Sequence, residues 1–264
     1  MPTTTPHLPT TPCGDLRFPK QPPVQLSLPQ LWPDLDLSYD EAYQLEERTR
    51  EQIHSDEWFA CRRRRITASD FHKVYTRKKA VDMKFLKRLY DPTKFYSEPT
   101  AHGIKHETTA KQQFILKYPN HHLHNIGLVV NPQFPFLGAS PDAKVCVDGE
   151  TAIIEIKCPF TARDKTVAEA CEDNSFCLMK DQANEYQLRQ NHEYWLQVQG
   201  QLLVTGAPFC LFIVCTSKDM QVIRVIPHLD TMSMLLGRLT DFYKKHPASE
   251  YLNSIAANSD IEPD

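Results

Sequence analysis

The stretch from residue 152 to residue 157 is short, apolar and rich in isoleucine, a pattern typical of a buried strand. Side chains alternate between the two faces of a strand, so Glu155 and Lys157 project from the same face. Residues 145–147 form a second short strand pattern, and an Asp-Gly pair, which is a hairpin-turn signal, follows it. The pattern therefore predicts a β-hairpin with two charged side chains on one face.

Helical and extended patterns fill much of the chain between residues 38 and 246. Ser38 and Glu41 have the spacing of a capping box and open a helix. The predicted elements are helices over 38–55, 81–90, 100–118, 181–205 and 229–245, and strands over 126–130, 209–216 and 221–226. This order predicts an α/β (α+β) sandwich with a mixed central sheet flanked by helices.

The two ends of the chain have a different composition. Residues 1–37 contain nine prolines and many threonines, which predicts a flexible tail. Residues 247–264 are predicted to be a flexible acidic tail. One domain, over residues 38–246, is expected between them.

Charge and cysteine content narrow the classes of protein to consider. The formal net charge of −3 does not favour a uniformly basic nucleic-acid binder, although a local basic surface could still hold DNA. None of the eight cysteines forms a C-x-x-C pair, which favours free thiols in a reducing intracellular compartment over disulfides or zinc sites. No segment has eighteen consecutive apolar residues, and the N-terminus has no apolar signal core.

Asp142 precedes the predicted hairpin, which would bring it back toward Glu155 and Lys157. Two neighbouring carboxylates repel each other unless a cation lies between them, and hard divalent cations prefer oxygen ligands. A lysine beside them can position a water or stabilise negative charge on a phosphate. The three side chains therefore suit metal-dependent phosphodiester hydrolysis. An exposed strand with an ordinary Glu–Lys pair is the alternative, because Glu-x-Lys alone is common.

The longer phrase resembles a known superfamily. Pro141-Asp142, followed by Glu155-Ile156-Lys157, resembles the PD-(D/E)XK nucleases, which have a restriction-endonuclease-like core. The sequence motif from Gly138 to Phe160 is similar to that of the branch that contains the YqaJ-type viral recombinases and the phage lambda exonuclease family. Further matches in the order of that branch are Trp58, Arg62, Ile66-Thr67-Ala68-Ser69, Gly103-x-x-x-Glu107 and Tyr194-x-x-Gln197-Val198-Gln199. The resemblance covers roughly residues 55 to 215.

The resemblance implies a metal site. Asp142 and Glu155 are expected to bind one or two Mg²⁺ ions, for which Mn²⁺ may substitute, with the carbonyl of Ile156 as a further ligand. Glu107 is expected to reach the metal, through a bound water. Lys157 would orient the attacking water.

Gln199 is expected at the same site, where it would hydrogen-bond a water or Lys157. The resemblance also implies a pocket for the 5′-phosphate of DNA, formed by Arg62, Ser69 and Ser140. Arginine suits this purpose because its donors match phosphate oxygens. Arg62 begins a run of four arginines, any of which could serve. Arg163, just after the central strand, is a further candidate phosphate contact.

A run of three histidines carries no such implication. His121, His122 and His124 lie in a predicted loop and match no position of the family. They are interpreted as surface residues.

The function that the resemblance implies is a Mg²⁺-dependent 5′-to-3′ exonuclease on linear double-stranded DNA, acting in recombination or repair. Its partners would be DNA ends and a single-strand annealing protein, and the related phage enzyme is a ring-shaped trimer. A eukaryotic host would place it in the nucleus. Two alternatives are a non-catalytic DNA-binding or scaffold module that retains the fold, and an endonuclease.

Overall fold

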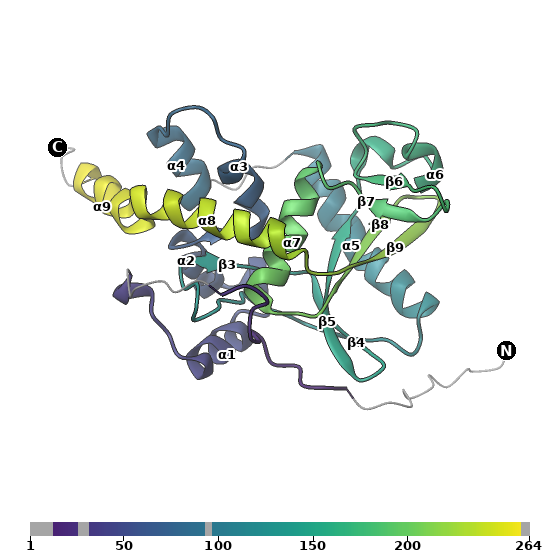
Figure 1. The fold of residues 1–264 in the computed structure, drawn as a ribbon, viewed down its shortest axis with the longest axis horizontal. Helices are drawn as coiled ribbons and strands as arrows, with labels where there is room; N and C mark the ends of the chain where they lie inside the picture. The colour runs from purple at the N-terminus through teal and green to yellow at the C-terminus, as the bar shows by residue number, and fades with distance from the viewer. Residues whose placement is uncertain (1–12, 26–31, 93–96, 260–264) are drawn as a thin grey trace.

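The computed structural model describes residues 13–25, 32–92 and 97–259. Its centre is a five-stranded sheet in the order β2-β4-β5-β8-β9 (Figure 1). The strands span His122–His124 (β2), Ala143–Val147 (β4), Glu150–Lys157 (β5), Cys210–Cys215 (β8) and Met220–Val225 (β9). Only β5 and β8 pair in parallel, and the other neighbours pair antiparallel. The sheet is therefore mixed, as the sequence predicts.

Helices cover both faces of this sheet (Figure 1). On one face, Ala110 and Phe114 of α5 (Glu98–Lys117) pack with Ile154 and Ile156 of β5. On the other face lies α7 (Glu193–Thr205), backed by α3 (Phe71–Tyr75) and α8 (Leu229–Lys245). The sheet alternation therefore directs the odd-numbered residues of β5, Glu155 and Lys157 included, toward α7.

The other α-helices and strands lie outside the five-stranded sheet. They are the helices α1 (Tyr39–Arg48), α2 (Asp56–Arg63), α4 (Met83–Tyr90), α6 (Val167–Ala170) and α9 (Ala248–Ser259), and the strands β1 (Ile66–Thr67), β3 (Leu137–Gly138), β6 (Leu178–Lys180) and β7 (Tyr186–Leu188). The capping box of Ser38 and Glu41 is present at α1. No helix of the described residues is long and apolar enough to cross a membrane.

The helix predicted over residues 181–205 begins only at Glu193. Residues before it form the antiparallel β6–β7 hairpin. The side chain of Asp181 accepts hydrogen bonds from the backbone N–H groups of Ala183 and Glu185, each at 2.9 Å, and Asn184 has a φ of 63°. These local bonds offer the backbone an alternative to the helix, so the prediction of one long helix is wrong.

The predicted flexible ends are also different where the structure describes them. Phe18 is fully buried in the main core, and the N–H of Lys20 donates to the carbonyl of Thr205 at 2.7 Å. At the other end, Ala248 and Tyr251 of α9 are buried. Composition predicts a tail at each end, proline-rich at the N-terminus and acidic at the C-terminus. Buried apolar side chains instead hold the described parts of both ends against the domain, and a backbone hydrogen bond adds to this at the N-terminal end. Residues 1–12, 26–31 and 260–264 lie outside the described part.

Candidate active site

Glu155 lies at the centre of the site. Its side chain is almost completely buried at the interface between β5 and α7. One carboxylate oxygen accepts from Lys157 Nζ at 2.7 Å and from Gln197 Nε2 at 2.5 Å, and the other accepts from Gln201 Nε2 at 2.6 Å. Three donors therefore compensate a carboxylate that burial would otherwise penalise.

Asp142 is brought to Glu155 by the predicted hairpin. Its backbone N–H donates to the carbonyl of Ile154 at 3.0 Å, and its carboxylate accepts from the N–H of Ile156 at 2.6 Å. Burial raises the pKa of Asp142 well above its ordinary value, and repulsion from Glu155 and then Glu107 raises it further. The negative charge at this position is thus poorly compensated by the protein alone.

Glu107 approaches the same site from α5, on the other side of the sheet. It forms an ion pair with Lys111 at 2.7 Å, and its side chain is 37 % exposed. Its repulsion of the Asp142 carboxylate shows that it lies within electrostatic reach of that group. Gly103, the other half of the Gly-x-x-x-Glu match, lies on the same helix with open space around it.

Lys157 is the cation of the site. Burial disfavours its charged form, but Glu155 and then Asp142 outweigh that effect and raise the pKa of Lys157 above its ordinary value. The ammonium also lies 4.6 Å from the ring centroid of Tyr194. A protonated lysine can donate hydrogen bonds and stabilise negative charge, and this is the chemistry that the side chain offers here.

The donor set suits a hard divalent cation. Asp142, Glu155 and Glu107 offer carboxylate oxygens, which Mg²⁺ prefers, and the raised pKa of Asp142 records a repulsion that a cation would relieve. In the described part of the chain, the oxygens of these three side chains do not all lie within 4.8 Å of one another.

A second polar cluster includes Ser140, which is two residues before Asp142 in the chain. Ser140 Oγ accepts from Trp58 Nε1 at 2.9 Å, and the guanidinium of Arg62 lies 4.1 Å from the Trp58 ring centroid. Arg62 also donates to Thr67 Oγ1, whose oxygen lies 3.3 Å from Ser69 Oγ. The structure thus brings Arg62, Ser69 and Ser140 together, because Arg62 and Ser140 both contact Trp58 and Arg62 and Ser69 both contact Thr67.

Arg62 differs from the three arginines that follow it. Arg63 pairs with Asp91 at 2.7 Å, and Arg64 pairs with Asp34 at 3.0 Å. Arg65 is buried and donates to the carbonyls of Pro135 and Cys61. Arg62 forms no ion pair with any described residue, and burial lowers its pKa to about 10. It lines a cavity of about 270 Å³ together with Trp58, Thr67 and Asp70.

Arg163 does not join this cluster. Its guanidinium stacks 4.1 Å from the ring centroid of Phe160, donates to the carbonyl of the same residue, and lies 3.4 Å from Asp164.

The comparisons with known proteins concern the part of the chain that holds these residues. The model of the YqaJ-like viral recombinase domain matches residues 57–208, which contain every residue of both clusters. The chain belongs to this family. Over 131 residues this YqaJ-like domain is 28 % identical to the alkaline nuclease of Orgyia pseudotsugata multicapsid polyhedrosis virus. That alignment covers 44 % of this chain but only 28 % of the length of the viral protein.

Solved structures show the same fold. The alkaline exonuclease LHK-Exo of Laribacter hongkongensis in complex with dAMP matches with a TM-score of 0.58 and 25 % identity, over 77 % of this chain and 99 % of that one. The SOX protein of Kaposi's sarcoma-associated herpesvirus, in a complex with RNA, matches with a TM-score of 0.57 and 15 % identity, over 77 % of this chain and 73 % of that one. The second likeness concerns the fold alone.

Gln199 of this YqaJ-like domain does not take part in the site. Its side chain is fully buried, donates to the carbonyl of Ile226 at 3.0 Å and accepts from the N–H of His228 at 2.8 Å. The predicted contact with Lys157 is therefore wrong. Gln197 and Gln201 contact Glu155 instead, because residues four apart share a helix face and a residue midway between them points away. That spacing was the available signal in the sequence.

Proposed function

We propose that this domain is a divalent-metal-dependent exonuclease that degrades linear double-stranded DNA from its 5′ ends. The observation that carries the proposal is the adjacency of two sites. Asp142, Glu155 and Lys157 converge on one of them, and Arg62 and Ser140 belong to the other. Ser140 and Asp142 are two residues apart, at most about 7 Å along the chain. A terminal nucleotide can therefore bridge the two.

The chemistry is hydrolysis of one phosphodiester bond. Water adds its oxygen to phosphorus, the bond from phosphorus to the 3′ oxygen breaks, and that oxygen takes up a proton. A bound Mg²⁺ supplies charge stabilisation for the attacking and leaving oxygens. Asp142 and Glu155, with the Ile156 carbonyl and Glu107, would hold the ion, and Mn²⁺ would substitute for it. Lys157 would donate a hydrogen bond that orients the water.

Arg62 would bind the 5′-phosphate. Its half-buried guanidinium pairs with no described carboxylate, so a phosphate would supply the missing negative charge. Hydrolysis leaves a new 5′-phosphate on the shortened strand, so the pocket can hold the product end for the next step. The single strand left behind has a 3′ end, which suits annealing to a complementary strand in recombination or repair.

The deciding experiment is digestion of linear duplex DNA with 5′-phosphate or 5′-hydroxyl ends, in Mg²⁺ or in EDTA. The wild type is expected to release mononucleotides only with Mg²⁺ and faster from 5′-phosphate ends. Lys157→Ala should lower turnover by about 10²- to 10³-fold or more while DNA binding is retained, because one stabilising donor contributes that much. Full activity of this variant would contradict the assigned role of Lys157.

The same assay separates the alternatives. A covalently closed circle should remain intact, and nicking or linearisation of it would indicate an endonuclease. Binding of DNA without release of nucleotides from any end would indicate a non-catalytic module. Light scattering with and without DNA would test whether the chain forms a homo-oligomer, as the resemblance to the trimeric phage enzyme implies.

A further inference from the structure

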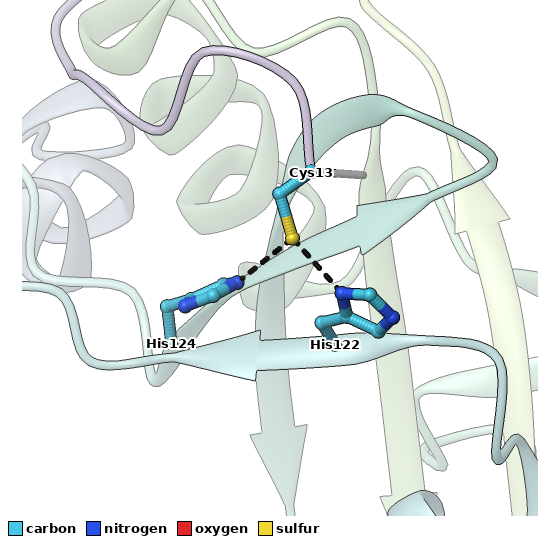
Figure 2. A group of neighbouring side chains, drawn as sticks. All are labelled: Cys13, His122 and His124. Carbon is cyan, nitrogen blue, oxygen red and sulfur yellow. Dashed lines mark hydrogen bonds between the residues drawn. The ribbon is translucent and has the colours of Figure 1, made fainter. Parts of the chain in front are cut away.

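A second group of metal-ligating side chains lies away from the nuclease site. Figure 2 shows the Cys13 side chain reaching from the N-terminal segment (residues 13–25) to two imidazoles on β2. Cys13 Sγ lies 2.9 Å from His122 Nδ1 and 3.3 Å from His124 Nε2. All three ligand atoms lie within 4.8 Å of one another. The run interpreted from sequence as loop histidines is therefore a strand whose alternate side chains meet a cysteine.

The register of the sheet explains this convergence. His122 and His124 are two residues apart on β2 and thus share a face. On β4, Cys146 is the partner of His122 and Lys144 is the partner of His124. Cys146 therefore points to the same face. Burial raises the pKa of Cys13, and the nearby thiol of Cys146 raises it further. Two imidazoles and the Cys13 thiol thus meet at the edge of the sheet. The Cys146 thiol lies on the same face, outside the group whose ligand atoms are all within 4.8 Å of one another.

The backbone of the N-terminal segment holds Cys13 there. A Cβ added at Gly14 would lie 2.2 Å from the carbonyl oxygen of Gly149, in the turn of the β4–β5 hairpin. Only glycine allows so close an approach, so the segment rests directly on this turn. Phe18, five residues after Cys13, is fully buried in the main core. Both contacts follow Cys13 in the chain and hold the backbone next to its thiol against the domain.

The observed spacing is near that of a zinc centre. Tetrahedral Zn²⁺ with a sulfur at about 2.3 Å and a nitrogen at about 2.05 Å separates the two ligand atoms by about 3.6 Å. The two separations of 2.9 and 3.3 Å would need to widen by about 0.7 and 0.3 Å. We propose that Cys13, His122 and His124 bind Zn²⁺, with Cys146 in the fourth position, and that the ion ties the N-terminal segment to the edge strand β2.

The charge balance favours this ligand set. Two thiolates and two neutral imidazoles neutralise the charge of Zn²⁺ completely. Thiolate sulfur is a softer ligand than carboxylate oxygen, so such a site selects Zn²⁺ over Mg²⁺. Lys144 and Arg50 are nearby cations, and both are engaged with Glu46, each at 2.9 Å. The inference does not depend on nuclease activity, because β2 is the edge strand and β5 lies two strands away.

The test uses Co²⁺ as a spectroscopic probe of the full chain carrying Asp142→Asn, which weakens the oxygen-ligand site. We expect about one equivalent of Co²⁺ to give a tetrahedral spectrum with thiolate-to-metal charge transfer, displaced by Zn²⁺. Cys13→Ser and His124→Asn should each lower the affinity for Co²⁺ at least about 10-fold. Cys171→Ser and His54→Asn, at a cysteine and a histidine elsewhere on the domain, are the matched controls and should bind as before.

A second readout follows the N-terminal segment itself. Zn²⁺ should slow amide hydrogen exchange in residues 13–25 of the parent chain and leave the exchange of Cys13→Ser unchanged. An octahedral Co²⁺ spectrum without charge transfer would overturn the proposal. So would unchanged Co²⁺ affinity in both ligand variants, or a Cys13–Cys146 disulfide that persists in a reducing buffer.

Discussion

At the scale of single residues, function depends on which charges the protein leaves uncompensated. The arginine run makes this plain, because three of its members are committed to Asp91, Asp34 or backbone carbonyls. Arg62 instead lies against Trp58, where burial disfavours its charge. Sequence alone could not choose among four identical side chains, since the choice depends on distant partners.

Arg62→Gln is expected to reduce the preference for 5′-phosphate ends. A charge-assisted hydrogen bond contributes about 1.5–3 kcal/mol, so the ratio of kcat/KM on 5′-phosphate to that on 5′-hydroxyl ends should fall roughly 10- to 100-fold. Arg63→Gln is the matched control, because Arg63 is paired with Asp91. An equal loss in both variants would show that the effect is general electrostatics and not a specific pocket.

The raised pKa of Asp142 predicts that the free energy of unfolding depends on pH. The pKa of Asp142 is higher in the folded protein than in the unfolded chain, so between these two pKa values the folded state binds more protons. The free energy of unfolding therefore falls as the pH rises from the unfolded pKa to the folded one. Asp142→Asn should therefore raise the melting temperature in EDTA at pH 8, with a difference that shrinks toward pH 4. Mg²⁺ should stabilise the wild type and leave the variant unaffected. Thermal denaturation across pH checks this, and a lower melting temperature of the variant at pH 8 would contradict it.

At the scale of elements, the alternation of side chains along β5 and the turn before it are sufficient to predict how Asp142, Glu155 and Lys157 come together. The hairpin does return Asp142 to Ile154 and Ile156, and Glu155 and Lys157 do share a face. The register of α7 was not predicted, because resemblance pointed to Gln199 while the helix presents Gln197 and Gln201 to Glu155. Which face of a buried helix meets the sheet depends on packing, which a short motif match does not specify.

The two glutamines should consequently differ in phenotype. Gln201→Ala removes a donor from the Glu155 carboxylate and should lower activity and shift its Mg²⁺ requirement. Gln199→Ala leaves the carbonyl of Ile226 and the N–H of His228 without their partner. It should lower the free energy of unfolding by about 1–3 kcal/mol with an unchanged Mg²⁺ requirement. Urea unfolding and Mg²⁺ titrations of activity measure the two effects, and reversed phenotypes would refute the assignment.

At the scale of the whole molecule, the boundary of the domain is wider than composition indicates. Proline-rich stretches are usually unable to bury enough apolar surface to become ordered. Residues 13–25 are held nevertheless, because Phe18 enters the core and Lys20 bonds to the end of α7 and to Asn131. These contacts join positions more than a hundred residues apart, so no local pattern could reveal them.

Phe18 is therefore expected to stabilise the YqaJ-like domain from outside the family match. Phe18→Ala should lower the free energy of unfolding by about 3–5 kcal/mol, because a fully buried phenylalanine leaves a cavity when truncated. Arg17→Ala, one residue earlier and exposed, should change it by less than about 0.5 kcal/mol. Urea unfolding in EDTA measures both without any contribution from bound metal. Equal stability of the two variants would mean that the N-terminal segment is only loosely attached, whereas the predicted difference would make it part of the folded domain.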